Sequence, residues 1–409
     1  MTDLNLSRRG LLAAAGLGLS VSFLGRSVQA AGDLGGRKMV VVVCRGGMDG
    51  LSVSPPIGDS AYAGLRGPIA ISAADALKLD GDFGLHPALA SVHAMALKGQ
   101  ARIAPAMAVP DRARSHFEAQ DVLESGGDRV YGTTSGWLNR ALQAMDPGRK
   151  VSALSVGATA PLILRGPAQA GSWSPGRSAE SNPRLPQLLT DLYADDPLLG
   201  PSFAKGLEIE DMAEVATAGV PPAGQMAPAG ATPAFIRQGQ AAADRIGRSL
   251  AGFMVQPGGP QLAALSADGF DTHANQGAAQ GQLANRLLYL DALLNGLREG
   301  LGETWSQTVV VCATEFGRTA RVNGTGGTDH GTASTALVLG GALKRGGIIG
   351  DWPGLQPAAL LDGRDTNPTL DSRSLFKGLL RDHMGMDLAA LDRTVFPGSA
   401  DARPVAGLV

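Results

Sequence analysis

The chain has 409 residues, of which 44% are hydrophobic and 18% are charged, and its formal net charge is −2. This balance is typical of a globular protein with a substantial core, built as one large domain or one domain with elaborations. The near-neutral charge, and the lack of a basic stripe interleaved with aromatic residues, argue against nucleic-acid binding. Because glycine is frequent (57 residues) and aromatic residues make up only 4%, we expect many turns and a core of Ala, Val and Leu.

The first 30 residues have the pattern of a twin-arginine export signal. The run SRRGLL at residues 7–12 opens an apolar stretch that ends at Leu24, and Val28-Gln29-Ala30 supplies the small residues of a cleavage site. A membrane anchor is the alternative, but the apolar stretch is short and ends in a cleavable pattern. We therefore expect the twin-arginine machinery to export residues 31–409, already folded and without a stable membrane anchor, to the periplasm or outside the cell.

Four apolar runs predict buried strands, and each is followed by polar residues that suit chemistry. Residues 39–44 are followed by Asp49, and residues 102–109 are followed by Arg114, Ser115 and His116. Residues 261–265 are followed by Asp271 and His273. Residues 308–312 are followed by Glu315 and Arg318 and, after a glycine-rich turn, by Asp329 and His330. In open α/β sheets, ligands bind beyond the carboxyl ends of the strands. We therefore expect these side chains to form a metal or anion site.

Several of these residues have more than one interpretation. Asp49 could belong to an ordinary Asp-Gly turn. Ser115 could cap the helix that follows it, or act as a nucleophile or metal-facing hydroxyl beside arginines that favour an anionic group. Asp271 and His273, two residues apart, could both face one metal, with Asp268 as a competing carboxylate.

The chain has only two cysteines, Cys44 and Cys312, and each lies in an expected buried strand. If those strands are neighbours, a disulfide could form in an oxidising compartment. Two buried free thiols are the alternative, and we prefer it.

The remaining pattern predicts an α/β fold with a mainly parallel sheet covered by helices on both faces. We expect helices at 86–97, 137–145, 235–253, 283–301 and 372–384, further strands at 153–156, 162–164 and 336–341, and a hairpin or turn at 344–350. The region from about 166 to 260, which is rich in loops, is expected to form a helical and loop insertion or cap rather than a separate domain.

Five motifs carry a resemblance to a known family: CRGGMDGL, PDRARSHFEAQD, GFDTHANQ, TEFGRTARVNGTGGTDHGT and VLGG. Together they span most of residues 39–341 and resemble the twin-arginine-exported family called domain of unknown function 1501. The order of strands and polar residues is more remotely similar to the alkaline phosphatase/sulfatase superfamily. That resemblance implies an alkaline-phosphatase-like fold and a periplasmic hydrolase of small phosphate or sulfate esters.

The resemblance also implies roles for individual residues. One or two divalent metal ions, zinc foremost and calcium, magnesium or manganese as alternatives, would be held by Asp49, Asp271, His273, Glu315, Asp329 and His330. Ser115 would be the nucleophile, and Arg114 or Arg318 would neutralise charge on the substrate.

The chain departs from the superfamily pattern at Phe316, which stands where a second metal ligand is usual; His116 could replace it. A mononuclear site, or a non-catalytic periplasmic binding or assembly protein, is therefore the alternative. The motifs for haem attachment and for nucleotide binding are absent, so neither cofactor is expected.

Overall fold

The computed structural model describes residues 36–145, 152–157, 161–173, 193, 196 and 232–409. The expected export signal at residues 1–30 and most of the expected insertion at about 166–260 lie outside these residues. Among the described helices, none has the length and apolar character needed to cross a membrane.

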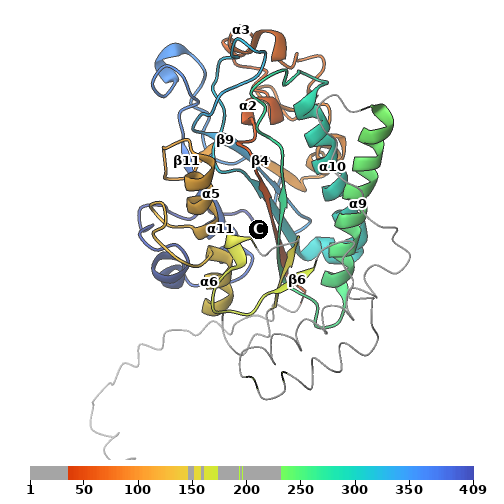
Figure 1. Ribbon diagram of the computed structural model, residues 1–409, viewed down its shortest axis with the longest axis vertical. Coiled ribbons are helices and arrows are strands. Elements are labelled where there is room, and N and C mark those ends of the chain that lie inside the picture. The colour runs from red at the N-terminus through yellow and green to blue at the C-terminus, as the bar shows by residue number, and fades with distance from the viewer. Residues whose placement is uncertain (1–35, 146–151, 158–160, 174–192, 194–195, 197–231) are drawn as a thin grey trace, which may run out of the picture. The chain divides into compact units, whose positions relative to one another are not determined.

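A nine-stranded sheet is the centre of this part of the chain (Figure 1). Its strands are β1 (Lys38–Cys44), β4 (Ala101–Ala108), β5 (Ala153–Val156), β6 (Gly171–Trp173), β7 (Leu262–Ala267), β8 (Thr308–Ala313), β9 (Ser334–Leu339), β10 (Gly347–Ile348) and β11 (Leu370–Asp371). The order across the sheet is β10-β4-β9-β8-β1-β7-β5-β6, and β11 also pairs with β4. A separate small sheet joins β2 (Leu77–Lys78) to β3 (Gly84–Leu85).

The sheet is parallel except at β9, which runs antiparallel to both of its neighbours, β4 and β8. This confirms the expected mainly parallel sheet. The reversed strand matters for the site, because the start of β9 lies at the same edge as the ends of β1, β4, β7 and β8. The loop before β9 therefore returns to the edge where the other polar segments begin.

Helices cover both faces of the sheet, as predicted (Figure 1). On one face lie α4 (Ala90–Ala96), α9 (Pro233–Val255) and α10 (Gln282–Leu301), and on the other lie α5 (His116–Ser125), α6 (Trp137–Ala144) and α11 (Ser372–Asp382). Alternate residues of β1 feed the two cores, Val40 and Val42 on the first face and Met39 and Val41 on the second. Three further short helices are α2 (Gly50–Val53), α3 (Tyr62–Arg66) and α12 (Leu388–Ala390).

The predicted helix at residues 235–253 is present as α9. It packs along α10, and its Phe253 and Met254 belong to the same hydrophobic core as the central strands. This part of the expected insertion is thus built into the layer that covers the sheet.

Three predicted elements differ in the structure. Residues 162–164 form a 3-10 turn with Ile163 and Leu164 buried, because a short apolar run does not by itself distinguish a strand from a turn. The segment expected as a hairpin or turn contains β10, which pairs parallel to β4. The helix expected from His86 begins at Ala90, where the Asp291 carboxylate accepts the backbone N–H groups of Ser91 and Val92.

The two cysteines are free and buried, which confirms the preferred interpretation. β1 and β8 are neighbours, but Cys312 lies opposite Val42, so Cys44 is two residues farther along its strand. A rise of about 3.3 Å per residue and a strand spacing of about 4.8 Å put their Cα atoms about 8 Å apart. A disulfide requires less than about 7 Å.

His383 gives the fold a testable pH dependence. Its ring Nε2 lies 2.9 Å from the carbonyl oxygen of Lys38, and the residue is buried. Burial lowers the pKa of His383 to about 4, against the opposing effect of that hydrogen bond. In the unfolded chain the pKa of histidine is about 6.5, so the unfolded state binds more protons between these values.

We therefore expect the stabilising contribution of neutral His383 to be complete above pH 6.5 and to be lost as the pH falls toward 4, at a total of about 3 kcal/mol. Urea unfolding at several pH values measures it. The His383→Gln variant should show a shallower fall in the free energy of unfolding over this range. Equal slopes for the two proteins would contradict the assignment.

Candidate metal centre

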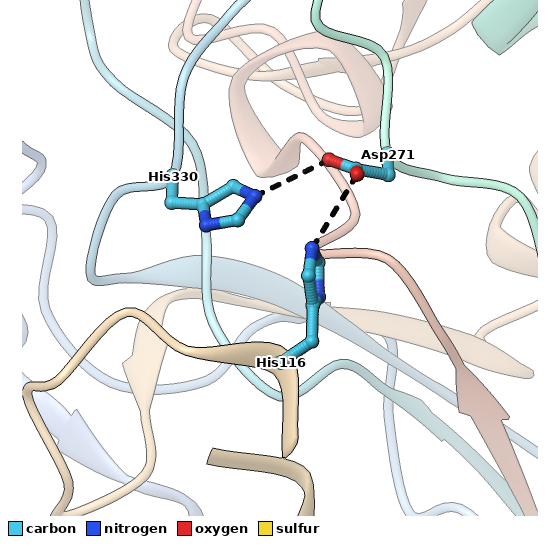
Figure 2. Close-up of side chains that lie close together, drawn as sticks. All are labelled: His116, Asp271 and His330. Atoms are coloured by element: carbon cyan, nitrogen blue, oxygen red, sulfur yellow. Dashed lines mark ion pairs between the residues drawn. The ribbon is translucent and has the colours of Figure 1, made fainter. Parts of the chain in front are cut away.

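Four side chains meet beyond the carboxyl edge of the sheet, and we call them the His/Asp cluster: His116, Asp271, His273 and His330. His116 begins α5 after β4, Asp271 and His273 follow β7, and His330 lies in the loop before β9. Figure 2 shows His116 and His330 pointing at the Asp271 carboxylate from two sides. These three residues can each offer a ligand atom within 4.8 Å of the others. His273 joins them through direct contacts with Asp271 and His330.

The distances within the cluster suit a small cation. The Nε2 atoms of His273, His330 and His116 lie 3.0, 3.4 and 3.5 Å from the Asp271 carboxylate oxygens. The Nε2 atoms of His273 and His330 lie 3.0 Å apart. Ligands at about 2.0–2.1 Å from a tetrahedral zinc ion would be about 3.3 Å from one another.

The opposite ring nitrogen of each histidine faces an oxygen. His116 Nδ1 lies 2.7 Å from Glu315 Oε1, His330 Nδ1 lies 2.9 Å from the Arg114 carbonyl, and His273 Nδ1 lies 3.4 Å from Asp329 Oδ1. These acceptors favour the tautomer with the proton on Nδ1, which turns the Nε2 lone pairs toward Asp271.

Lone pairs and a carboxylate that face one another repel unless a cation lies between them. His116 Nε2 is also buried and has no hydrogen-bond partner among the described residues. The donor set and its orientation therefore fit a bound metal ion.

The surroundings of the cluster shift the pKa values of its groups in different directions. Burial lowers the pKa of His330, which favours its neutral, metal-binding form, whereas the hydrogen bond that His116 donates to Glu315 raises the pKa of His116. Burial alone would raise the pKa of Asp271, but Arg318, at 2.7 Å, together with His273 and His116 outweighs it and lowers that pKa. The cluster side chains are 27–46% exposed, so a small molecule can reach them.

Two carboxylates predicted as ligands lie behind the histidines instead. Glu315 is fully buried, and it accepts hydrogen bonds from the backbone N–H groups of Gly46 and Gly47 as well as from His116. Asp329 faces His273 Nδ1 and accepts a hydrogen bond from Asn323. Each carboxylate thus orients a histidine: Glu315 through Oε1, which faces His116, and Asp329 through Oδ1, which faces His273.

Asp49 makes no hydrogen bond or ion pair with the His/Asp cluster among the described residues. Its carboxylate forms a buried ion pair with Arg66 of α3 and accepts hydrogen bonds from Gln276 at 2.6 Å and Ser52 at 2.9 Å. Both Asp49 and Arg66 have no exposed surface. The expected ligand is therefore the centre of a buried polar network, and no sequence pattern marked Arg66 as its partner.

The three remaining predicted residues surround the cluster. Arg318 is buried; its Nη1 pairs with Asp271 and its Nη2 has no hydrogen-bond partner within the described part of the chain. Arg114 pairs with Asp365 at 2.8 Å. Ser115 is the N-cap residue of α5, directly before His116, and its side chain makes no capping hydrogen bond.

Sequence reasoning missed Gln276, Arg364 and Asp365. Gln276 lies in the motif GFDTHANQ, and its Oε1 accepts hydrogen bonds from Thr272 and Thr328, so the spacing from Thr272 was an available signal. Asp365 and Arg364 lie in the C-terminal part of the chain, outside every motif.

Comparisons with solved structures give weak likenesses. A phosphonate monoester hydrolase from Silicibacter pomeroyi is 12% identical, with 90% of this chain and 75% of that chain covered and a TM-score of 0.41. The C-terminal periplasmic domain of EcEptC from Escherichia coli is 11% identical, with 89% and 87% covered and a TM-score of 0.38. The same domain in complex with Zn is 10% identical, with 74% and 72% covered and a TM-score of 0.34. All three TM-scores lie below 0.5.

Sequence comparison gives a clearer result. No curated protein matches the chain. A family model described as "Protein of unknown function (DUF1501)" matches residues 36–395, which include all of the His/Asp cluster. The chain therefore belongs to the DUF1501 family.

Proposed function

We propose that this protein is an exported, metal-dependent hydrolase of phosphate or sulfate esters that uses a single cation. The supporting observation is the convergence of three histidine Nε2 atoms on one carboxylate, with each Nδ1 turned to an oxygen. Residues 1–30 would direct export by the twin-arginine pathway, and residues 31–409 would form the working domain in the periplasm or outside the cell.

The donor set favours zinc or a similar transition-metal ion. Three imidazoles and one carboxylate suit zinc, whereas calcium and magnesium prefer sites built from oxygen ligands. Asp49 Oδ2 pairs with Arg66, whose positive charge would oppose a second cation at the carboxylate that the resemblance implied as its ligand. When bound, the cation would supply Lewis-acid polarisation of an ester oxygen.

The residues around the cluster would bind and orient a tetrahedral oxyanion. Because Ser115 makes no side-chain cap, the first-turn N–H groups of the ten-residue helix α5 remain available to an anion. Arg318 Nη2, buried without an acceptor, would gain one from a substrate oxygen. Ser115 lies between Arg114 and His116 in the sequence, and its hydroxyl would serve as nucleophile or anion donor.

The alternative is a non-catalytic binding or assembly protein. The Arg66–Asp49 pair favours it, because that pair withdraws a carboxylate from the second metal site of a two-metal hydrolase.

Ser115→Ala tests the proposal. Against a panel of aryl phosphate monoesters, phosphate diesters and sulfate esters, we expect the zinc-loaded wild type to hydrolyse at least one class and the variant to lose about 10³-fold or more in kcat/KM. Metal content should stay unchanged, and Ser115→Thr, which keeps the hydroxyl, is the matched control. No turnover by the zinc-loaded wild type would favour the binding protein, and equal turnover by Ser115→Ala would remove Ser115 from the chemistry.

A further inference from the structure

We propose that Asp365 is a positioning residue for the metal centre: through Arg114 and Arg364 it fixes the direction in which His330 presents its Nε2. This inference rests on the metal site in the proposed function. Asp365 is the last residue of a turn that begins at Leu361. This turn lies outside the segments that carry the His/Asp cluster.

Asp365 is a fully buried hub for two arginines. Its Oδ2 accepts hydrogen bonds from Arg114 Nε at 2.9 Å and from Thr332 Oγ1 at 2.8 Å, and its Oδ1 accepts one from Arg364 Nη1 at 2.9 Å. A buried carboxylate with charged partners on both oxygens holds those partners in fixed positions.

Both arginines in turn hold His330. The backbone carbonyl of Arg114 lies 2.9 Å from the ring Nδ1 of His330, and Arg364 Nη2 donates to the backbone carbonyl of His330 at 2.9 Å. One arginine therefore sets the rotation of the imidazole ring, and the other sets the position of its backbone. Together they determine where Nε2 points.

The conformation of Arg114 makes this arrangement depend on Asp365. Arg114 has a φ of +57°, a region that residues other than glycine rarely adopt, and such a conformation persists only where its surroundings impose it. The pair with the buried Asp365 carboxylate is the contact that does so, with the exposed Asp362 adding a weaker one. If Arg114 relaxed, its carbonyl would turn away from His330, and His116, two residues along, would move as well.

The turn is itself anchored next to the cluster. The backbone N–H of Ala320 donates to the Arg364 carbonyl at 3.0 Å, and Thr319 forms a β-bridge with Asp365. Both contacts lie within two residues of Arg318. Asp365 is thus connected to the segments on each side of the metal centre.

A matched control separates positioning from general stability. Lys377 is fully buried and pairs with Asp392 at 2.6 Å, and its other acceptors are the carbonyl groups of Ser399 and Ala402. Asp392→Asn removes the same charge from a pair with a buried cation, but from a pair that makes no contact with the His/Asp cluster.

The experiment measures zinc affinity of the metal-free, folded proteins by calorimetric titration, alongside their free energies of unfolding in urea. We expect both variants to lose stability and only Asp365→Asn to lose zinc affinity, by about 10- to 100-fold. Equal zinc affinity for Asp365→Asn and the wild type, or an equal loss in Asp392→Asn, would overturn the proposal.

A milder pair of variants applies if Asp365→Asn does not fold. Arg364→Ala removes a side chain that is 40% exposed and paired with its neighbour Asp365, and Arg381→Ala removes one that is 32% exposed and paired with its neighbour Asp382. Only Arg364→Ala should weaken zinc binding, and equal effects of the two would contradict the inference.

If the wild type itself does not bind zinc, the metal site of the proposed function fails and the positioning role with it. If the wild type binds zinc and the Asp365 and Arg364 variants bind it equally well, only the positioning role fails.

Discussion

His330→Ala is expected to lower the affinity for Zn²⁺ about 100-fold and to abolish any ester hydrolysis. A four-ligand zinc site contributes about 10–16 kcal/mol of binding free energy, so one ligand corresponds to about 3 kcal/mol, or about two factors of ten. His330 lies 3.0 Å from His273 Nε2 and 3.4 Å from Asp271 Oδ1, so its loss opens one side of the cluster. Calorimetric zinc titration and assays with the ester panel measure both effects.

The matched control is His93→Ala, which removes the same side chain from α4, where the ring contacts the Lys78 carbonyl instead of the cluster. This variant should keep both the zinc affinity and the activity of the wild type. If His330→Ala binds zinc as tightly as His93→Ala does, the metal site is not the His/Asp cluster.

Asp49→Ala is expected to destabilise the fold by about 3–5 kcal/mol, because it leaves the Arg66 guanidinium buried without a counter-charge. The hydrogen bonds from Gln276 and Ser52 would be lost with it. Urea unfolding measures the loss. The folded variant should still bind zinc with wild-type affinity, because Asp49 makes no hydrogen bond or ion pair with the His/Asp cluster among the described residues.

Two further variants sharpen this test. Asp49→Leu/Arg66→Met replaces the whole pair with apolar groups and should recover much of the lost stability. Asp244→Ala breaks an ion pair with Arg248 at the surface and should cost no more than about 1 kcal/mol. A variant Asp49→Ala that folds as well as the wild type but no longer binds zinc would restore Asp49 as a metal ligand, as the family resemblance implied.

Much of the fold could be predicted from the sequence. The apolar runs that form β1, β4, β7 and β8 are long, and each is followed by polar residues, so both the strands and the edge where the site lies were predictable. The antiparallel direction of β9 was not, because strand direction is set by contacts with neighbours and leaves no mark in a six-residue apolar run.

The site could be predicted in part. Asp271, His273 and His330 were expected together, and the structure brings them together with His116. The sequence does not distinguish carboxylates that would contact a metal directly from those that orient a histidine. Glu315 and Asp329 differ from a metal ligand only in the atoms that face their carboxylate oxygens. The ion pair of Asp49 and the hub at Asp365 depend on arginines that have no pattern of their own.

Elemental analysis of the protein purified from the exported fraction tests the central claim most directly. We expect close to one equivalent of zinc or another transition metal per chain, and a large loss of that metal in His330→Ala. Two equivalents would contradict the single-cation site. No metal in the wild-type protein, even after incubation with zinc, would contradict the metal centre itself.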